Sequence, residues 1–260
     1  MKSALKLFTL ASGIFFAACG SPSTRGEVKS GQNAEGQKVT YLSKGTGSNS
    51  VEKIIGANDL VVVTKNGVSL PETLKPLVNA FGKIEMGCTA THIGNGLVLT
   101  AGHCFDAGES VQKDKTCDYT VDWGYRADAK PFLTSKCVKI LAMVWNDNQD
   151  WAIFQVDKAP NAKVEIERSS TKPQVGSTIT IFGHPQGRPL EWSQFCTVQP
   201  ASNGNFGEFI FSHQCDTEPG NSGSTVLNAQ GKVVGIHDGG VVPWNYATFV
   251  QDTEIPELAP

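Results

Sequence analysis

The sequence lacks the excess of positive charge that nucleic-acid-binding proteins carry. Its 260 residues include 22 Lys and Arg against 25 Asp and Glu, so that the formal net charge is −3. A protein that binds DNA or RNA concentrates basic residues because it must neutralise phosphates. We therefore expect no nucleic-acid partner.

The sequence also lacks an apolar run long enough to cross a membrane, which takes about 20 residues. The longest run, Leu7 to Phe16, follows Lys2 and Lys6 and is followed by small residues before Cys19. This pattern is typical of an export signal. The ending FAAC resembles a lipoprotein box, in which the cysteine becomes the lipidated first residue. We predict a signal peptide at 1–19, lipidation of Cys19 and export to the bacterial cell envelope. An ordinary secretory peptide cut near Cys19 is the alternative.

Helical periodicity is scarce as well, and only residues 72–82 hint at a helix, which Pro76 weakens. Short segments rich in β-branched and aromatic residues alternate with turn residues, and 27 glycines are present. Closed or packed barrels are the usual way to protect the edges of so many strands. The predicted class is all-β, with strands at 59–65, 96–102, 118–125, 137–145, 151–157, 177–183, 208–213, 232–237 and 246–250.

Residues 20–53 are rich in Gly, Ser, Asn and Lys and contain few large apolar side chains. Such a segment buries too little surface to offset the entropy lost on ordering. We predict a linker or propeptide at 20–53 and a folded domain at 54–260.

Seven cysteines are present, and six remain if Cys19 leaves with the signal or carries lipid. An even number suits an oxidising compartment, and the sequence lacks the C-x-x-C spacing of zinc sites, so we expect no metal. Six cysteines can pair in many ways, and the sequence leaves the choice open. Nearest-neighbour pairing gives Cys88–Cys104, Cys117–Cys137 and Cys196–Cys215.

Three polar residues stand in turns or strand ends that suit catalysis. Ser222 lies in the glycine-rich run PGNSGS, His103 follows an apolar strand in LTAGHC, and Asp150 precedes the strand WAIFQV. Each signal alone is weak, because a single His or Asp is more often a structural or turn residue. Together they supply the nucleophile, the base and the group that orients the base.

The runs TAGHC, DWAIFQV and GNSGS, in this chain order, resemble those of the trypsin-like serine peptidases of the chymotrypsin fold. The resemblance implies two antiparallel six-stranded β-barrels, at about 54–160 and 161–260, with the active site in the cleft between them. It also implies a serine endopeptidase that needs no cofactor and acts on proteins or peptides. A non-catalytic envelope lipoprotein that keeps the fold for binding is the alternative from another class.

The resemblance implies a role for each residue. His103 takes the proton of Ser222 as its hydroxyl attacks a peptide carbonyl, and Asp150 orients the imidazole. Glycines on both sides of the serine allow a sharp turn, so that the amides of Gly220 and Ser222 form the oxyanion hole.

Within the family, the sequence leans towards the bacterial glutamyl endopeptidases. Asn221 stands before the serine, where trypsins carry Asp, and Thr217 and His237 stand where that branch binds an acidic side chain. Asp216, in contrast, lies where trypsins keep the acid that binds Lys or Arg. We favour glutamate specificity narrowly and keep a Lys/Arg-specific peptidase that uses Asp216 as the alternative.

The run VEKIIGAND resembles an activation site of this family. Cleavage between Lys53 and Ile54 would expose a new amino terminus, which the resemblance places in the second barrel near His237. This predicts a zymogen, and the cut would also release the enzyme from a lipid anchor on Cys19. The alternative is a permanent tether, with Ile54 starting the first strand.

Overall fold

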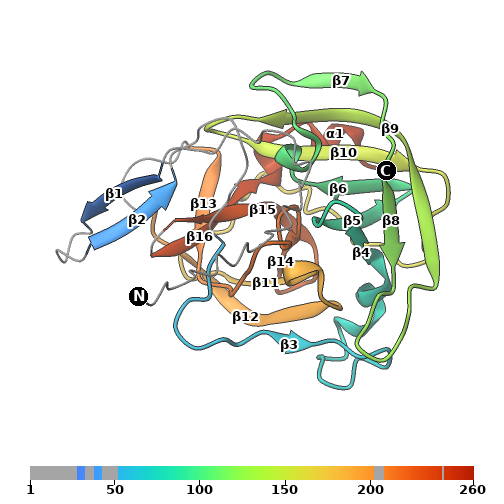
Figure 1. The fold of residues 1–260 in the computed structure, drawn as a ribbon, viewed down its shortest axis with the longest axis horizontal. Coiled ribbons are helices and arrows are strands. Elements are labelled where there is room, and N and C mark those ends of the chain that lie inside the picture. The colour runs from blue at the N-terminus through green and yellow to red at the C-terminus, as the bar shows by residue number, and fades with distance from the viewer. Residues whose placement is uncertain (1–27, 33–37, 43–51, 202–207, 242) are drawn as a thin grey trace, which may run out of the picture.

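The computed structural model describes residues 28–32, 38–42, 52–201, 208–241 and 243–260. The predicted signal peptide and its Cys19 lie outside these residues. Most of the described chain forms two β-barrels side by side, the first in green and yellow and the second in orange and red in Figure 1. The predicted all-β class with two six-stranded barrels is confirmed.

The first barrel is a closed ring of antiparallel strands in the order β10-β6-β5-β4-β8-β9, because β9 also pairs with β10. A further strand, β7, extends the sheet from the outer side of β9. The bounds are β4 (Phe81–Ile84), β5 (Thr89–Gly94), β6 (Leu97–Thr100), β7 (Gln112–Lys115), β8 (Thr120–Trp123), β9 (Leu133–Trp145) and β10 (Asp150–Val156).

The second barrel closes in the same way, in the order β11-β14-β15-β16-β13-β12, with β12 pairing back to β11. The short strand β3 is added to the edge of β12. The bounds are β3 (Val61–Val62), β11 (Thr178–Gly183), β12 (Glu191–Gln199), β13 (Ile210–His213), β14 (Thr225–Asn228), β15 (Val233–Val241) and β16 (Trp244–Phe249).

Large apolar side chains fill both barrels and join them. Trp123 and Trp151 are fully buried in the core that includes the first barrel, and Ile179 lies in a separate cluster inside the second. Phe81 of β4 stacks on Phe182 of β11 with ring centroids 4.7 Å apart. This buried contact joins the two barrels.

Helices are few and short among the described residues. They are the 3₁₀ turns η1 (Lys75–Ala80), η2 (Gly102–Phe105), η3 (Pro185–Gly187) and η4 (Val250–Asp252) and the helix α1 (Ile255–Leu258). The hinted helix at 72–82 is therefore the single 3₁₀ helix η1, in which a proline occupies the first turn. Within the part of the chain that is described, every helix falls short of the length and apolarity needed to span a membrane.

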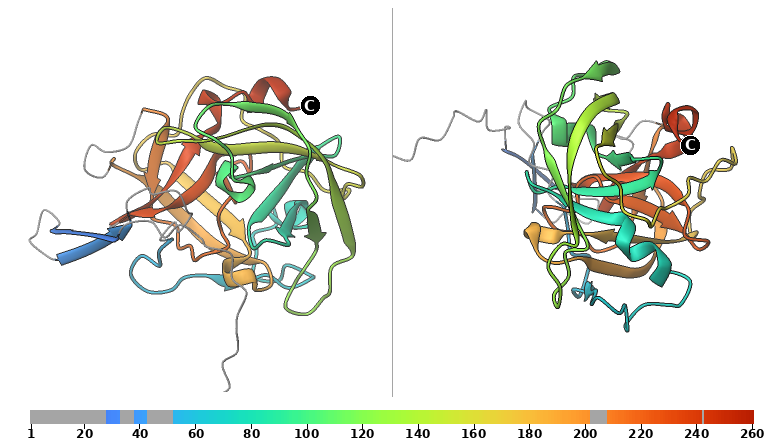
Figure 2. Two further views of the ribbon diagram at one scale, coloured as in Figure 1. Left: turned by 45° about the horizontal axis from the view of Figure 1, so that its top comes forward. Right: turned by 90° about the vertical axis from the view of Figure 1, so that its right-hand side faces the viewer.

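Two segments differ from the predicted boundaries. The predicted linker contains a two-stranded hairpin, β1 (Val28–Gln32) with β2 (Lys38–Leu42), which lies at the left of Figure 1. The segment that carries β3 belongs to the second barrel by its pairing, although the prediction gave residues from 54 onwards to the first. Figure 2 shows this segment in blue and cyan along the base of the second barrel.

Candidate active site

His103 lies in the tight turn η2, directly after strand β6 of the first barrel. Its neighbour Cys104 forms a disulfide with Cys88, which precedes strand β5. This bridge ties the turn to the adjacent strand and so restricts the position of the histidine. The His103 side chain is nearly buried, with 7% of it exposed.

Asp150, at the start of β10, holds His103 through two contacts. Its Oδ2 atom lies 2.5 Å from Nδ1 of the imidazole, and its Oδ1 atom accepts a hydrogen bond of 2.9 Å from the His103 backbone amide. With Nδ1 donating to the carboxylate, Nε2 is the atom that can accept a proton. The carboxylate thus fixes both the ring and the backbone of the residue expected to act as base.

A second layer of hydrogen bonds positions Asp150. Its backbone amide donates to the hydroxyl of Thr248 over 2.9 Å, and that hydroxyl donates to the buried carboxylate of Asp238, also over 2.9 Å. Thr248 lies on β16 and Asp238 on β15, so the second barrel supports an acid that belongs to the first. Neither residue stands out in the sequence.

Ser222 lies in the turn before β14, and two glycines make that turn possible. Gly220 has φ +110° and Gly223 has φ +82°, values that other residues rarely adopt. A Cβ atom on Gly223 would lie 2.1 Å from Thr100 Oγ1 and 2.7 Å from the backbone nitrogen of Ala101. The turn therefore packs directly against the strand that leads to His103, which brings the two barrels together at this point.

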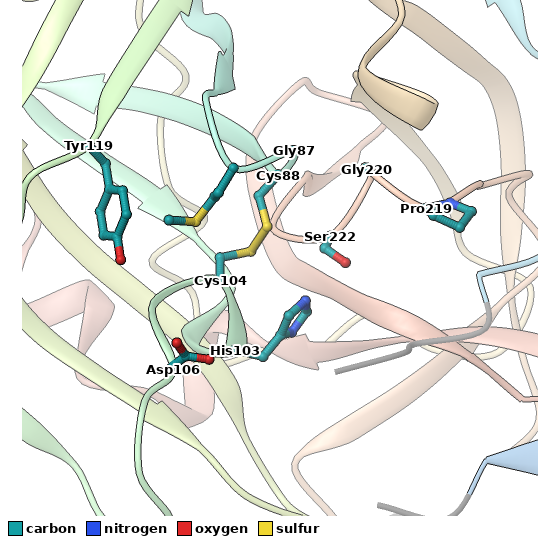
Figure 3. A pocket seen from close by; sticks show the side chains of 10 residues that line it. Gly87, Cys88, His103, Cys104, Asp106, Tyr119, Pro219, Gly220 and Ser222 are labelled. Atoms are coloured by element: carbon teal, nitrogen blue, oxygen red, sulfur yellow. A yellow bond between two sulfur atoms is a disulfide. The ribbon is translucent and has the colours of Figure 1, made fainter. Parts of the chain in front are cut away.

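Figure 3 shows the His103 ring and the Ser222 hydroxyl directed into one cleft. The cleft has a volume of about 500 Å³, and the Cys88–Cys104 disulfide, Tyr119 and Gly220 form part of its wall. The structure thus brings the predicted nucleophile, base and orienting acid to one site. Gly220, whose amide is predicted to belong to the oxyanion hole, lines the same cleft.

Glu52 is an unexpected occupant of this site. The Ser222 hydroxyl donates to Glu52 Oε1 over 2.7 Å, and the Asn221 amide donates to Oε2 over 3.3 Å. The Ser222 amide also hydrogen-bonds this carboxyl group. Burial is the main cause that raises the pKa of Glu52 to about 8, and these hydrogen bonds and the nearby His103 oppose the rise.

The predicted pocket residue His237 is fully buried on β15 and faces the same carboxyl group. Its Nε2 atom lies 3.8 Å from Glu52 Oε1, and its Nδ1 atom lies 3.2 Å from Nε2 of His213. Burial lowers the pKa of His237 well below its ordinary value and that of His213 to about 3. Both rings are neutral at pH 7, and a proton on His213 Nε2 would leave His237 with its own proton on Nε2, the atom that faces Glu52.

Thr217 and Asp216, the other predicted pocket residues, both contact the amino-terminal segment. The Thr217 amide donates to the Lys53 carbonyl over 3.0 Å. The carboxylate of Asp216 accepts hydrogen bonds of 2.7 Å from the amides of Ile55 and Asp59, one on each oxygen. Asp216 therefore anchors the segment at 55–59.

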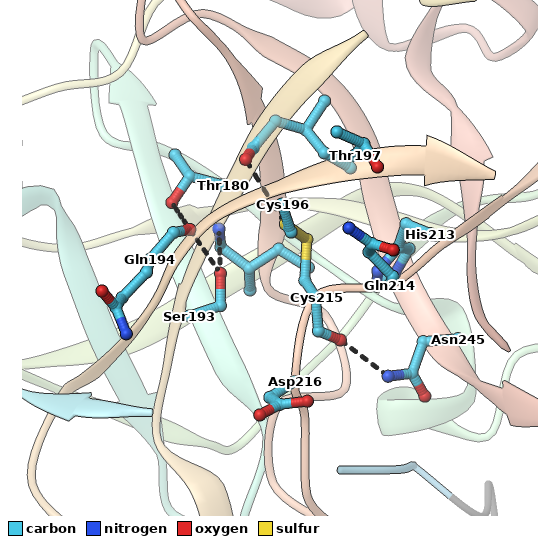
Figure 4. Close-up of a disulfide and its surroundings, with 12 residues drawn as sticks. Thr180, Ser193, Gln194, Cys196, Thr197, His213, Gln214, Cys215, Asp216 and Asn245 are labelled. Carbon is cyan, nitrogen blue, oxygen red and sulfur yellow. Dashed lines mark hydrogen bonds between the residues drawn. A yellow bond between two sulfur atoms is a disulfide. The ribbon is translucent and has the colours of Figure 1, made fainter. Parts of the chain in front are cut away.

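The three disulfides pair the cysteines as nearest neighbours in sequence: Cys88–Cys104, Cys117–Cys137 and Cys196–Cys215. The third bridge connects β12 to the irregular segment between β13 and the Ser222 turn (Figure 4). Asn245 Nδ2 donates to the Cys215 carbonyl next to this bridge over 2.8 Å.

The sulfur atoms of Cys88 and Cys104 and a ring nitrogen of His103 lie within 4.8 Å of one another. Both sulfurs belong to a disulfide and are not the thiolates that bind metals. This group therefore does not suit a metal ion.

The sequence reasoning missed Glu52, Asn245, Thr248 and Asp238. The sequence predicts a linker or propeptide at 20–53, which includes Glu52, and gives this residue no role. Its position in the run VEKIIG, one residue before the expected cut, was the available signal.

Comparisons with known proteins agree with this geometry. The profile of a family described as "Trypsin-like peptidase domain" matches residues 88–236. A glutamyl endopeptidase of Staphylococcus epidermidis is 31% identical over 117 residues, which is 40% of this chain. The chain spans about two-fifths of the length of this curated relative, 39%.

Solved structures show the same fold. A Glu endopeptidase in complex with MPD superposes with a TM-score of 0.58 at 21% identity, covering 75% of this chain and 93% of that one. A serine-to-alanine mutant of Rv3671c from M. tuberculosis H37Rv, in an inactive form, superposes with a TM-score of 0.52 at 15% identity, covering 73% of this chain and 92% of that one.

Proposed function

The chain belongs to the family of trypsin-like peptidases, and on this premise we propose that it is an exported serine endopeptidase that prefers glutamate before the cleaved bond. The observation that carries the proposal is the pair of contacts from Asp150 to His103, with Ser222 in the same cleft. Its substrates are proteins or peptides.

In the proposed reaction, Ser222 Oγ attacks the carbonyl carbon of the substrate while His103 Nε2 takes the hydroxyl proton. The carbonyl oxygen becomes negative, and the amides of Gly220 and Ser222 donate hydrogen bonds to it. One such donor is worth roughly 3–4 kcal/mol in the transition state. His103 then gives its proton to the leaving amine, and a water molecule repeats the sequence on the acyl-enzyme. Asp150 stabilises the imidazolium in both steps.

The test is covalent labelling of the processed enzyme with a fluorophosphonate, followed by peptide mapping. We expect the label on Ser222, and we expect Ser222→Ala to lose both the label and the cleavage of casein. A removed member of such a triad costs many orders of magnitude in rate. Casein cleavage by Ser222→Ala at the wild-type rate would overturn the proposal. A folded, processed protein without any label would favour a binding module instead.

Two features of the pocket support glutamate specificity. If His213 Nε2 carries the proton of the contact between the two histidines, His237 has an Nε2 proton that it can donate to a side-chain carboxylate. Both oxygens of Asp216 already accept backbone hydrogen bonds, which makes this acid a poor partner for Lys or Arg. The similarity to a protein named glutamyl endopeptidase points the same way.

Cleavage-site profiling on a peptide library tests this preference. His237→Ala should lower kcat/KM for peptides with glutamate before the cleaved bond more than for peptides with a neutral residue there. If only Lys and Arg substrates lose activity, the alternative that uses Asp216 is correct.

The three disulfides support export, because disulfides persist in oxidising compartments. Lipid attachment at Cys19 stays a prediction. Mass spectrometry of the amino-terminal peptide from the envelope fraction would detect it.

A further inference from the structure

Glu52 occupies the place that a substrate needs. Its side chain is 0% exposed and lies between the catalytic serine and the pocket histidine, 170 residues away from Ser222 in sequence. It engages the Ser222 hydroxyl and the amides of Asn221 and Ser222. A substrate carbonyl would need the same hydroxyl and the Ser222 amide.

The residue after Glu52 is held firmly by the second barrel. The Lys53 amide donates to Asn245 Oδ1 over 3.0 Å, and the Lys53 carbonyl accepts from Asn245 Nδ2 over 2.8 Å and from the Thr217 amide over 3.0 Å. Asp216 then binds the amides of Ile55 and Asp59. The segment from Lys53 onwards is thus anchored beside the pocket, and Glu52 reaches from this anchor to the nucleophile.

The contact with Glu52 is incompatible with catalysis. Ser222 has a single hydroxyl proton, which it must pass to His103 when it attacks a carbonyl. While the Glu52 carboxyl group lies 2.7 Å from Ser222 Oγ, it competes for that proton and fills the space of the attacked carbonyl. The uncut chain is therefore held in a form that cannot attack a peptide bond.

We propose that Glu52 is an internal ligand that keeps the uncut chain inactive, and that activation is hydrolysis of the Glu52–Lys53 peptide bond. The site of the cut rests on the proposed glutamate specificity, because Glu52 would be the residue before the cleaved bond. The cut lies one residue before the Lys53–Ile54 bond that the sequence suggested.

The anchoring contacts favour this bond over its neighbour. Cleavage after Glu52 releases the blocking carboxyl group and leaves all three backbone hydrogen bonds of Lys53 in place. Cleavage after Lys53 would remove those bonds together with Glu52 and leave the buried Asn245 amide without its partners on Lys53. Cleavage after Glu52 therefore frees the pocket and keeps the hydrogen bonds between Lys53 and the second barrel.

The first cut also changes the charge of the pocket. Burial keeps the Glu52 carboxyl group of the uncut chain neutral up to about pH 8, and burial also keeps His213 and His237 neutral. After the cut, the nitrogen that now donates to Asn245 Oδ1 becomes an ammonium group. One hydrolysis thus removes an acid from the pocket and places a cation beside it.

The reaction balances as an ordinary hydrolysis. Because Glu52 in place blocks its own serine, the segment must first withdraw and enter the cleft of a second, active copy. Ser222 of that copy forms an ester with the Glu52 carbonyl carbon, and the Lys53 nitrogen leaves with a proton from His103. Water then cleaves the ester, which leaves a carboxylate on Glu52 and an amine on Lys53.

The position of the cut is tested on a chain that cannot cleave itself. The Ser222→Ala chain, carrying the residues before Glu52, is incubated with a trace of processed wild-type enzyme, and its new amino terminus is sequenced. Lys53 as the first residue supports the proposal. Ile54 as the first residue, or equal cleavage of a Glu52→Gln version of this chain at the same bond, overturns the assigned cut.

The blocking role is tested by the rate of fluorophosphonate labelling of uncut chains that are checked by intact mass. Glu52→Ala should react with the probe at least tenfold faster than the uncut wild type, at a rate close to that of the processed enzyme. Glu72→Ala, which removes an exposed glutamate, is the matched control and should react as slowly as the wild type. Equal labelling of uncut wild type and Glu52→Ala overturns the blocking role. If no form reacts, including the processed one, it is the proposed peptidase function that fails.

Discussion

The burial of Glu52 predicts that the uncut chain loses stability as the pH rises. The perturbation is Glu52→Gln, which keeps the shape of the side chain and removes its charge. Both chains also carry Ser222→Ala, so that neither cleaves itself. The quantity compared is the free energy of unfolding in urea, measured at a series of pH values.

The size of the effect follows from the two pKa values of the carboxyl group. Its pKa rises from 4.5 to about 8 on folding, and each pH unit between these values is worth about 1.4 kcal/mol. A raised carboxyl pKa gives stability that is fully present below pH 4.5 and is lost as the pH rises through about 8. Relative to Glu52→Gln, the chain with Glu52 should lose up to about 5 kcal/mol over this window. Ser222→Ala removes one hydrogen bond that lowers this pKa, so the window is at least as wide in the silenced chains.

The comparison isolates Glu52 from its neighbours. His103 and His237 face the same carboxyl group, and the charge of Glu52 also affects the pKa of Tyr246. All three residues are present in both chains, so their titrations largely cancel when the two free energies of unfolding are subtracted. A difference that stays constant between about pH 5 and about pH 8 would refute the reasoning. It would mean that the carboxyl group is ionised and solvated throughout, outside the pocket.

Three further predictions concern the frame of the site. Thr248→Val removes the acceptor for the Asp150 amide, so it should lower kcat about tenfold and the free energy of unfolding by roughly 1–3 kcal/mol. Thr248→Ser keeps the hydroxyl and should have wild-type values of both. Steady-state kinetics and urea unfolding measure the two quantities. Gly223→Ala should yield little folded protein, because its Cβ would meet backbone atoms at 2.7 Å, and a soluble, fully active variant would contradict this. Replacing Cys88 and Cys104 by alanine should lower the free energy of unfolding by roughly 2–4 kcal/mol, and an unchanged thermal midpoint would argue against a stabilising role for this bridge.

The strands that the sequence predicts best are those with continuous β-branched and aromatic side chains. The segment expected at 151–157 is β10, Asp150–Val156, and the one expected at 177–183 is β11, Thr178–Gly183. Strand β12 is missed because Glu191, Ser193 and Gln194 interrupt its apolar pattern. Hydrogen bonds with β11, β13 and β3 hold this segment as a strand, although its own composition does not predict one.

The sequence also predicts some residues of the candidate site and not others. His103, Asp150 and Ser222 could be predicted because each lies in a short local motif, and their chain order identifies the arrangement. The role of Glu52 could not be predicted, because it depends on hydrogen bonds with Asn221 and Ser222. These residues are about 170 positions away in sequence, and only the closed second barrel brings them near. The position of Asp216 in sequence suggested a pocket floor, but its hydrogen bonds to Ile55 and Asp59 depend on the path of the amino-terminal segment.

The strand β7 has a consequence for the behaviour of the protein at high concentration. It lies at the outer rim of the first barrel in Figure 1 and pairs with β9 on one side only, so its other edge can template pairing with another chain. Its sequence, QKDK, gives this edge strand two lysines and an aspartate, and Asp114, between the paired residues Lys113 and Lys115, has φ +58°. Charge and a local kink are two devices that prevent edge-to-edge aggregation. Replacing Lys113 and Lys115 by valine would remove both positive charges of this strand and should make concentrated samples self-associate, which light scattering would record.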